Sequence, residues 1–174
     1  SSNVLEHVPP ETLRKIHRHT ARVLHDSGCA IHRFNPGDHY KKFTGNPCNF
    51  LQFSESTWHL LGGYGLSYHN RMRSSDHARE AREAGLNIRL RAHRVDENSM
   101  QAIERGDLQL APRFRRHSSA DLAATYTWLV LASGEMGIAQ DFPLRGDTLE
   151  EILQRLKNGD AKGDNPTSGP DANA

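Results

Sequence analysis

The strongest constraint on the fold of this chain is a run of β-branched, aromatic and aliphatic residues at 125–132, TYTWLVLA. The run is short and rich in strand-forming residues, so it predicts a buried strand. A second strand is predicted at 86–92, where every second residue is apolar, and a third at 29–34, between Gly28 and a turn. Three strands alone leave exposed edges, so we expect this sheet to be incomplete on its own.

Helical patterns separate the predicted strands. Pro9 and Pro10 suit the start of a helix, which we expect to span 10–27 and to end with Gly28 as a left-handed cap. A second helix is expected from Ser74 to Ala84, closed by Gly85. Shorter helical segments are predicted at 54–61, 99–105 and 118–123. This alternation predicts an α/β fold with a mainly parallel sheet.

The chain divides into three parts. Residues 1–133 hold the predicted helices and strands of one domain, with a long aromatic-rich insertion at 35–73. Residues 134–157 are expected to form a linker and an amphipathic helix that begins at a capping box of Thr148 and Glu151. Residues 158–174 are rich in Gly, Asp, Asn and Pro, which predicts a disordered tail.

The composition limits the partners of the protein. The 22 basic and 21 acidic side chains give a formal net charge of +1, so nothing in the balance calls for nucleic acid or an anionic membrane. The two cysteines, Cys29 and Cys48, form no CxxC pair and are expected to be reduced thiols in a cytoplasmic protein. No apolar run approaches the ~18 residues that would span a bilayer. The oligomeric state is left open.

A motif at the N-terminus carries a family resemblance. The stretch Ser2-Asn3-Val4-Leu5-Glu6-His7-Val8-Pro9 resembles the segment after the fourth strand of class I S-adenosylmethionine (SAM) dependent methyltransferases. The following helix with Arg22-Val23-Leu24 and the strand Ala30-Ile31-His32 are similar to the next elements of that family. The stretches Asp38-His39-Tyr40 and YHNRMR at 68–73 resemble one bacterial methyltransferase subgroup. The resemblance covers residues 1–133.

The resemblance implies the C-terminal part of a Rossmann-like, seven-stranded methyltransferase sheet, with about strands five to seven and their helices. The family's glycine-rich turn and the acidic residue that binds the ribose are absent from the 174 residues. We therefore expect SAM to be bound mainly by an N-terminal half that precedes Ser1, and this fragment alone not to bind SAM usefully. The missing initiator Met also suggests that the natural chain begins upstream.

The resemblance implies a site at the carboxyl ends of strands four and five. Ser2, Asn3 and Val4 would form one wall of the cofactor pocket. Glu6 and His7 are the catalytic candidates, with His7 as general base because its ordinary pKa lies near neutrality. The alternative is that Glu6 neutralises a helix N-terminus and that His7 packs at the helix entry.

Further candidates lie in the insertion. Asp38 is a third catalytic candidate, although Asp38, His39 and Tyr40 could equally form a solvent-facing turn. The substrate-binding candidates are His39, Tyr40, Asn70, Arg71 and Arg73. The two arginines could bind a carboxylate or phosphate on the methyl acceptor, or could tie the insertion to the sheet.

No metal is expected from the sequence. Some related methyltransferases use the acids and the histidine of E-x-x-E-H to bind a divalent ion, but Asn3 stands in place of the first Glu here.

The expected function is methyl transfer to a small-molecule acceptor; the alternative is a non-catalytic remnant that acts as an interaction module. The run at 49–58 is similar to lysozyme-like glycosidases, but the catalytic Glu frame of those enzymes is missing upstream, and we treat the similarity as coincidence.

Overall fold

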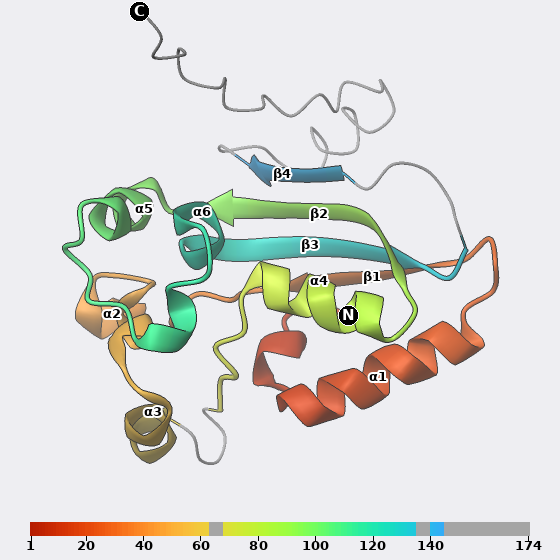
Figure 1. The fold of residues 1–174 in the computed structure, drawn as a ribbon, viewed down its shortest axis with the longest axis horizontal. Coiled ribbons are helices and arrows are strands. Elements are labelled where there is room, and N and C mark those ends of the chain that lie inside the picture. The colour runs from red at the N-terminus through yellow and green to blue at the C-terminus, as the bar shows by residue number, and fades with distance from the viewer. Residues whose placement is uncertain (63–67, 135–139, 145–174) are drawn as a thin grey trace, which may run out of the picture.

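A four-stranded sheet is the centre of the described part of the protein (Figure 1). The computed structural model describes residues 1–62, 68–134 and 140–144. The strands are β1 (Cys29–Phe34), β2 (Asn87–Val95), β3 (Ala124–Ala132) and β4 (Gln140–Leu144). They are arranged in the order β1-β3-β2-β4. The three strands predicted from the sequence are therefore confirmed.

Helices lie on one face and at one end of this sheet. The α-helices are α1 (Pro10–Val23), α2 (Lys41–Thr44), α3 (Glu55–Gly62), α4 (Ser74–Glu83), α5 (Glu97–Glu104) and α6 (Ser119–Leu122). The 3-10 helices are η1 (Leu5–His7), η2 (Asn49–Gln52) and η4 (Pro112–Phe114). Helices α1 and α4 lie along the sheet, whereas α2, α3, α5 and α6 gather at the end where β2 finishes (Figure 1). Among the described residues no helix is long and apolar enough to cross a membrane.

The α/β class is confirmed, but the prediction of a mainly parallel sheet is wrong. Strand β3 lies between β1 and β2 and runs antiparallel to both, and only the β2–β4 pair is parallel. The reason lies in the connection from β2 to β3. It stays at one end of the sheet, where the Asp96 N–H donates to the Ala123 carbonyl at 3.0 Å, so β3 must return in the opposite direction. An alternating helix–strand pattern does not distinguish such a long hairpin from a crossover.

Two further expectations need correction. Residues 140–144 form β4 within the segment predicted as a linker. Helix α1 ends at Val23, four residues earlier than predicted, because Leu24 is already extended, with φ −71° and ψ 126°. Gly28 is not left-handed; the glycines with positive φ in the described residues are Gly45, Gly85 and Gly106. The predicted helix at 148–156 and the tail at 158–174 lie outside the described residues.

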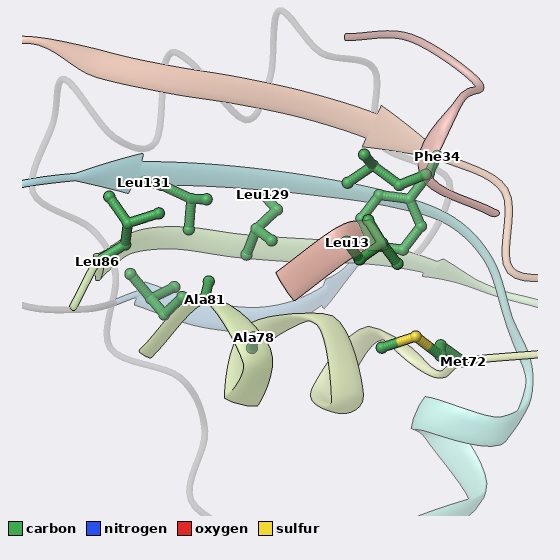
Figure 2. Close-up of a cluster of buried hydrophobic side chains, with 10 residues drawn as sticks. Leu13, Phe34, Met72, Ala78, Ala81, Leu86, Leu129 and Leu131 are labelled. Carbon is green, nitrogen blue, oxygen red and sulfur yellow. The ribbon is translucent and has the colours of Figure 1, made fainter. Parts of the chain in front are cut away.

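The main hydrophobic core lies between the sheet and the two long helices. Leu13 of α1 and Ala78 and Ala81 of α4 pack against Leu129 and Leu131 of β3, as Figure 2 shows. All five side chains are buried. The apolar sides of α1 and α4 both pack against the apolar residues of β3, so the two helices cover the same face of the sheet.

A second core belongs to the end of the sheet. Phe50, Leu51 and Trp58 of the 35–73 insertion pack with Phe114 and Leu122 from the β2–β3 connection. The insertion therefore does not form a core of its own but shares one with residues 95–123. This shared core holds the insertion at the carboxyl ends of β1 and β2.

Candidate functional site

Three segments that are distant in the sequence meet at the carboxyl end of β1. They are η1, the loop that follows Phe34, and the stretch 68–70 before α4. The Asn70 N–H donates to the Glu6 carbonyl at 2.9 Å, and the Asn35 N–H donates to Glu6 Oε1 at 3.1 Å. These bonds bring side chains from all three segments into one cluster, formed by Glu6, His7, His39 and His69.

Glu6 is the acidic member of the cluster. Its side chain is buried, with a relative exposure of only 1%. One carboxylate oxygen, Oε1, accepts the Asn35 N–H, whereas Oε2 has no hydrogen-bond partner among the described residues. An unpaired buried carboxylate oxygen is costly, and this atom is able to accept a further hydrogen bond.

Three histidine rings surround this region. The ring centroid of His39 lies 5.0 Å from that of His7 and 4.9 Å from that of His69, and the His7 and His69 centroids are 6.1 Å apart. His7 and His39 are exposed to solvent, whereas His69 is buried. His69 thus forms the floor of the cluster, and the other two rings form its open side.

The hydrogen bonds of the rings define their roles. His7 Nδ1 lies 2.9 Å from the Tyr68 carbonyl oxygen, which can only accept, so in the neutral ring Nδ1 carries the proton and Nε2 the lone pair. Both nitrogens of His69 are used, since Nδ1 accepts the Arg71 N–H at 3.1 Å and Nε2 lies 3.4 Å from the Asn35 carbonyl oxygen.

Two of the rings are held neutral. Burial lowers the pKa of His69 well below its ordinary value, and the nearby Arg73 lowers it further. Partial burial of the ring and the neighbouring His7 also lower the pKa of His39. At neutral pH the cluster therefore contains two uncharged imidazoles, those of His39 and His69.

Asp38, the third predicted catalytic residue, has a different environment. Its Oδ1 accepts the Tyr40 N–H at 2.8 Å, and its side chain is buried. Burial raises the pKa of Asp38, although the hydrogen bond from Tyr40 opposes this effect. The carboxylate thus shapes the turn that carries His39, and Tyr40 is exposed. The segment forms a turn in which His39 and Tyr40 face solvent, as that alternative expects, whereas Asp38 does not; the catalytic role of Asp38 stays a prediction.

Asn70 connects the segments of the site. Its Nδ2 donates to the carbonyls of Leu5 and Val8 at 2.7 and 2.8 Å, and its Oδ1 accepts the Met72 N–H at 2.9 Å. These bonds hold both ends of η1 against the stretch before α4. Asn70 therefore positions Glu6 and His7, and its amide is fully occupied by the backbone.

Arg71 and Arg73 are enclosed by the protein. Arg71 donates to the carbonyls of Phe50 and Phe53 and contacts Glu55, and its guanidinium lies 5.0 Å from the centre of the Trp58 ring. Both arginine side chains have a relative exposure of 0%. The contacts of Arg71 join parts of the 35–73 insertion to one another, which gives this arginine a structural role within the insertion. Binding of an anionic acceptor by Arg71 and Arg73 stays a prediction.

The predicted cofactor wall lies beside β1. Ser2 forms a parallel bridge with Arg33, and the Asn3 N–H donates to the Arg33 carbonyl at 2.8 Å. Asn3 has a left-handed backbone, with φ 52°, and Val4 is 44% exposed. Ser2, Asn3 and Val4 are exposed, and their role in binding a cofactor stays a prediction.

His69 is the member of the cluster that the sequence reasoning did not select. It lies within the YHNRMR stretch at 68–73, which resembles one bacterial methyltransferase subgroup. This resemblance was the sequence feature that could have identified His69 as a candidate. The grouping of Glu6, His7 and His39 was not foreseen either. In the described part of the chain, these three residues offer ligand atoms that all lie within 4.8 Å of one another.

Comparisons with protein-family models, curated proteins and solved structures gave no match for this chain.

Proposed function

We propose that this chain is the C-terminal half of a class I SAM-dependent methyltransferase that acts on a small-molecule hydroxyl or amine. The observation that carries the proposal is that strands form at the three places in the chain where the resemblance implies them. These strands are β1, β2 and β3, which the resemblance assigns to the fifth, sixth and seventh strands of the family sheet. All three pair within one sheet, which supports this assignment.

The N-terminal residues give independent support. Ser2 pairs in parallel with Arg33 on the edge of β1 that β3 leaves free, and the Arg33 N–H donates to the Ser1 carbonyl at 2.9 Å. In the proposed enzyme this is where the fourth strand ends, beside the fifth. The pairing agrees with the VLEHVP motif at the same position in the chain.

The site also lies where this function requires it. Ligands of open α/β sheets bind outside the carboxyl ends of the strands, and the Glu6 cluster lies at the carboxyl end of β1. SAM, when bound, supplies a sulfonium methyl group. Transfer of this methyl group to an acceptor oxygen or nitrogen would leave the carbon–sulfur electron pair on sulfur and would release the acceptor proton. The acceptor proton passes to the free Nε2 of His7, whose Nδ1–H remains bonded to Tyr68.

The first test is SAM binding. The natural coding sequence, with everything upstream of Ser1, is expressed beside residues 1–174, and both proteins are titrated with SAM by calorimetry. We expect micromolar binding by the longer protein and binding at least about 100-fold weaker by residues 1–174. An upstream sequence without a strand and glycine-rich turn, or no SAM binding by the longer protein, would contradict the proposal and favour the non-catalytic alternative.

The second test concerns His7. In the natural enzyme His7→Ala should lower kcat by about 100-fold or more and leave SAM affinity within about threefold. His19→Ala, on the exposed side of α1, is the matched control and should change neither quantity. Unchanged turnover in His7→Ala would remove His7 from the chemistry without affecting the family assignment.

A further inference from the structure

We propose that residues 148–156, which lie outside the described residues, form a helix that packs on the outer face of the sheet, over β2 and β3. The outer face is the face opposite α1 and α4. This packing gives the sheet a second helical layer, supplied by the segment that follows β4. It is independent of the methyltransferase assignment.

The outer face of the sheet carries an apolar patch. Leu90 and Ala92 of β2 lie opposite Val130 and Trp128 of β3 in the strand pairing, so the four side chains point to the same side. They form one cluster, and in the described part of the chain this cluster holds residues of these two strands alone. The main core lies on the other side of the sheet. The patch is therefore a second apolar surface that an additional element can cover.

Burial on the outer face decreases from one edge of the sheet to the other. Ala92 and Leu90, on the strand next to β4, have relative exposures of 0% and 4%. Val130 on β3 is half-buried, and its partner Ile31 on β1 is 56% exposed. This gradient fits a covering element that begins at the β4 edge and reaches as far as β3.

The sequence after β4 supplies a matching apolar stripe. Four large apolar residues recur at the spacing i, i+3, i+4 and i+7, which places them on one side of a helix: Leu149, Ile152, Leu153 and Leu156. Polar residues occupy the opposite side, among them Gln154. An isolated helix of this length is marginal in water, so its apolar side needs a surface to pack against.

The connection from β4 limits which surface this helix can reach. Strand β4 ends at Leu144, so the three residues 145–147 separate it from Thr148. A helix that follows a strand after a connection of about two to six residues packs on a face of the same sheet. The inner face is already covered by α1 and α4 (Figure 1). The outer face is therefore the surface that the helix covers.

The test measures how fast a thiol on the outer face reacts with N-ethylmaleimide. Val130→Cys is introduced into the protein of natural chain length, and the reaction is followed by mass spectrometry of the peptide that contains position 130. Cysteine behaves as a small apolar residue and should fit this position. We expect slow reaction in this parent protein and reaction at least about 10-fold faster when Leu153→Asp is added, because a carboxylate opposes burial on an apolar surface.

Gln154→Asp is the matched control, because it introduces the same residue on the opposite side of the predicted helix. It should leave the rate within about twofold of the parent. The two native thiols are internal references. Cys29 is exposed and should react rapidly in every variant, whereas Cys48 is buried in the second core and reacts only if the protein unfolds. If Leu153→Asp makes Cys48 reactive, Leu153→Ser and Gln154→Ser are compared instead.

Equal rates at position 130 in the Leu153 variant and the parent, or equal acceleration by the Gln154 variant, would overturn the proposal. Protection of position 130 that increases with protein concentration would also overturn it, because a second copy of the chain would then cover the face. No measurement involves SAM or methyl transfer, so this packing and the proposed function can fail separately.

Discussion

At the scale of single residues, three buried histidines are distinct from the site cluster, namely His17 of α1, His32 of β1 and His77 of α4. His17 and His77 have relative exposures of 0%, and His32 has 8%. Neither nitrogen of His17 or His77 has a hydrogen-bond partner among the described residues. Burial lowers the pKa of all three, to about 4 for His32 and to about 3 for His77. The folded protein therefore keeps these rings neutral where the unfolded chain protonates them.

This predicts a loss of stability in mild acid. Above about pH 6.5 the rings are neutral in both states and contribute no pH dependence; as the pH falls below this value, only the unfolded chain gains protons, until the folded pKa is reached. Urea unfolding measures the free energy of unfolding at about pH 7.5 and at about pH 5. Between these values it should fall by about 2 kcal/mol less in His77→Leu than in the unmodified protein.

The control is His19→Gln, whose ring is exposed in α1. Its drop in the free energy of unfolding should match that of the unmodified protein. An equal drop in His77→Leu would mean that His77 is protonated in the folded state or is not buried.

The catalytic candidates show what a motif can predict. Glu6 and His7 are adjacent in the sequence, so their motif places them together wherever η1 lies. His39 and His69 are more than 30 residues away, and their approach depends on the loop after β1 and on the hydrogen bonds of Asn70. No local pattern encodes these contacts, which is why the grouping of Glu6, His7 and His39 was not predicted.

At the scale of elements, helix α4 ends in a Schellman motif. The Leu86 N–H donates to the Ala81 carbonyl at 3.0 Å and the Gly85 N–H to the Arg82 carbonyl at 2.9 Å. Gly85 has φ +85°, as the sequence prediction of a glycine stop requires. The motif turns the chain directly into β2, so that Leu86 enters the main core.

The left-handed backbone of Gly85 predicts how substitutions at this position change the free energy of unfolding. A Cβ added at this position meets nothing within 4 Å, so the only cost is the left-handed backbone. Gly85→Ala should lower the free energy of unfolding by about 1–2 kcal/mol, and Gly85→Asn by less, because Asn tolerates this conformation better. Thermal or urea unfolding measures both. Equal stability of Gly85→Ala and the unmodified protein would contradict the assigned backbone.

Strand β2 shows where periodicity fails within an element. The alternation from Leu86 to Ala92 predicts one buried face. The pairing with β3 instead shifts between Ile88 and Leu90, so that Leu90 and Ala92 pack with Trp128 and Val130 in a separate cluster. A β-bulge reverses the face after it, and its position depends on the partner strand rather than on the sequence of β2.

At the scale of the whole molecule, Arg73 connects parts that are distant in the chain. Its guanidinium donates to the carbonyls of Pro36, Arg71 and Leu122 and lies 5.2 Å from the centre of the Phe50 ring. Burial lowers its pKa to about 10, so the group remains charged at neutral pH. Arg73 thus joins the loop after β1, the insertion and the end of α6.

Arg73→Met should leave these carbonyls without their donor, and we expect a loss of about 2–4 kcal/mol in the free energy of unfolding. Urea unfolding gives the value. Arg18→Met, on the exposed side of α1, is the control and should stay within about 0.5 kcal/mol of the unmodified protein. If Arg73→Met were as stable as the control, the buried guanidinium would not hold these segments together.

The sequence by itself determined the local features of this protein. The three predicted strands, the positions of α3 and α4 and the glycine stop at Gly85 follow from periodicity and from backbone sterics, which act over a few residues. The tertiary structure alone decided that β3 runs antiparallel between β1 and β2, that β4 pairs with β2, and that His39 lies beside Glu6 and His7. These features depend on contacts between distant segments, and a linear pattern does not specify the order in which such segments meet.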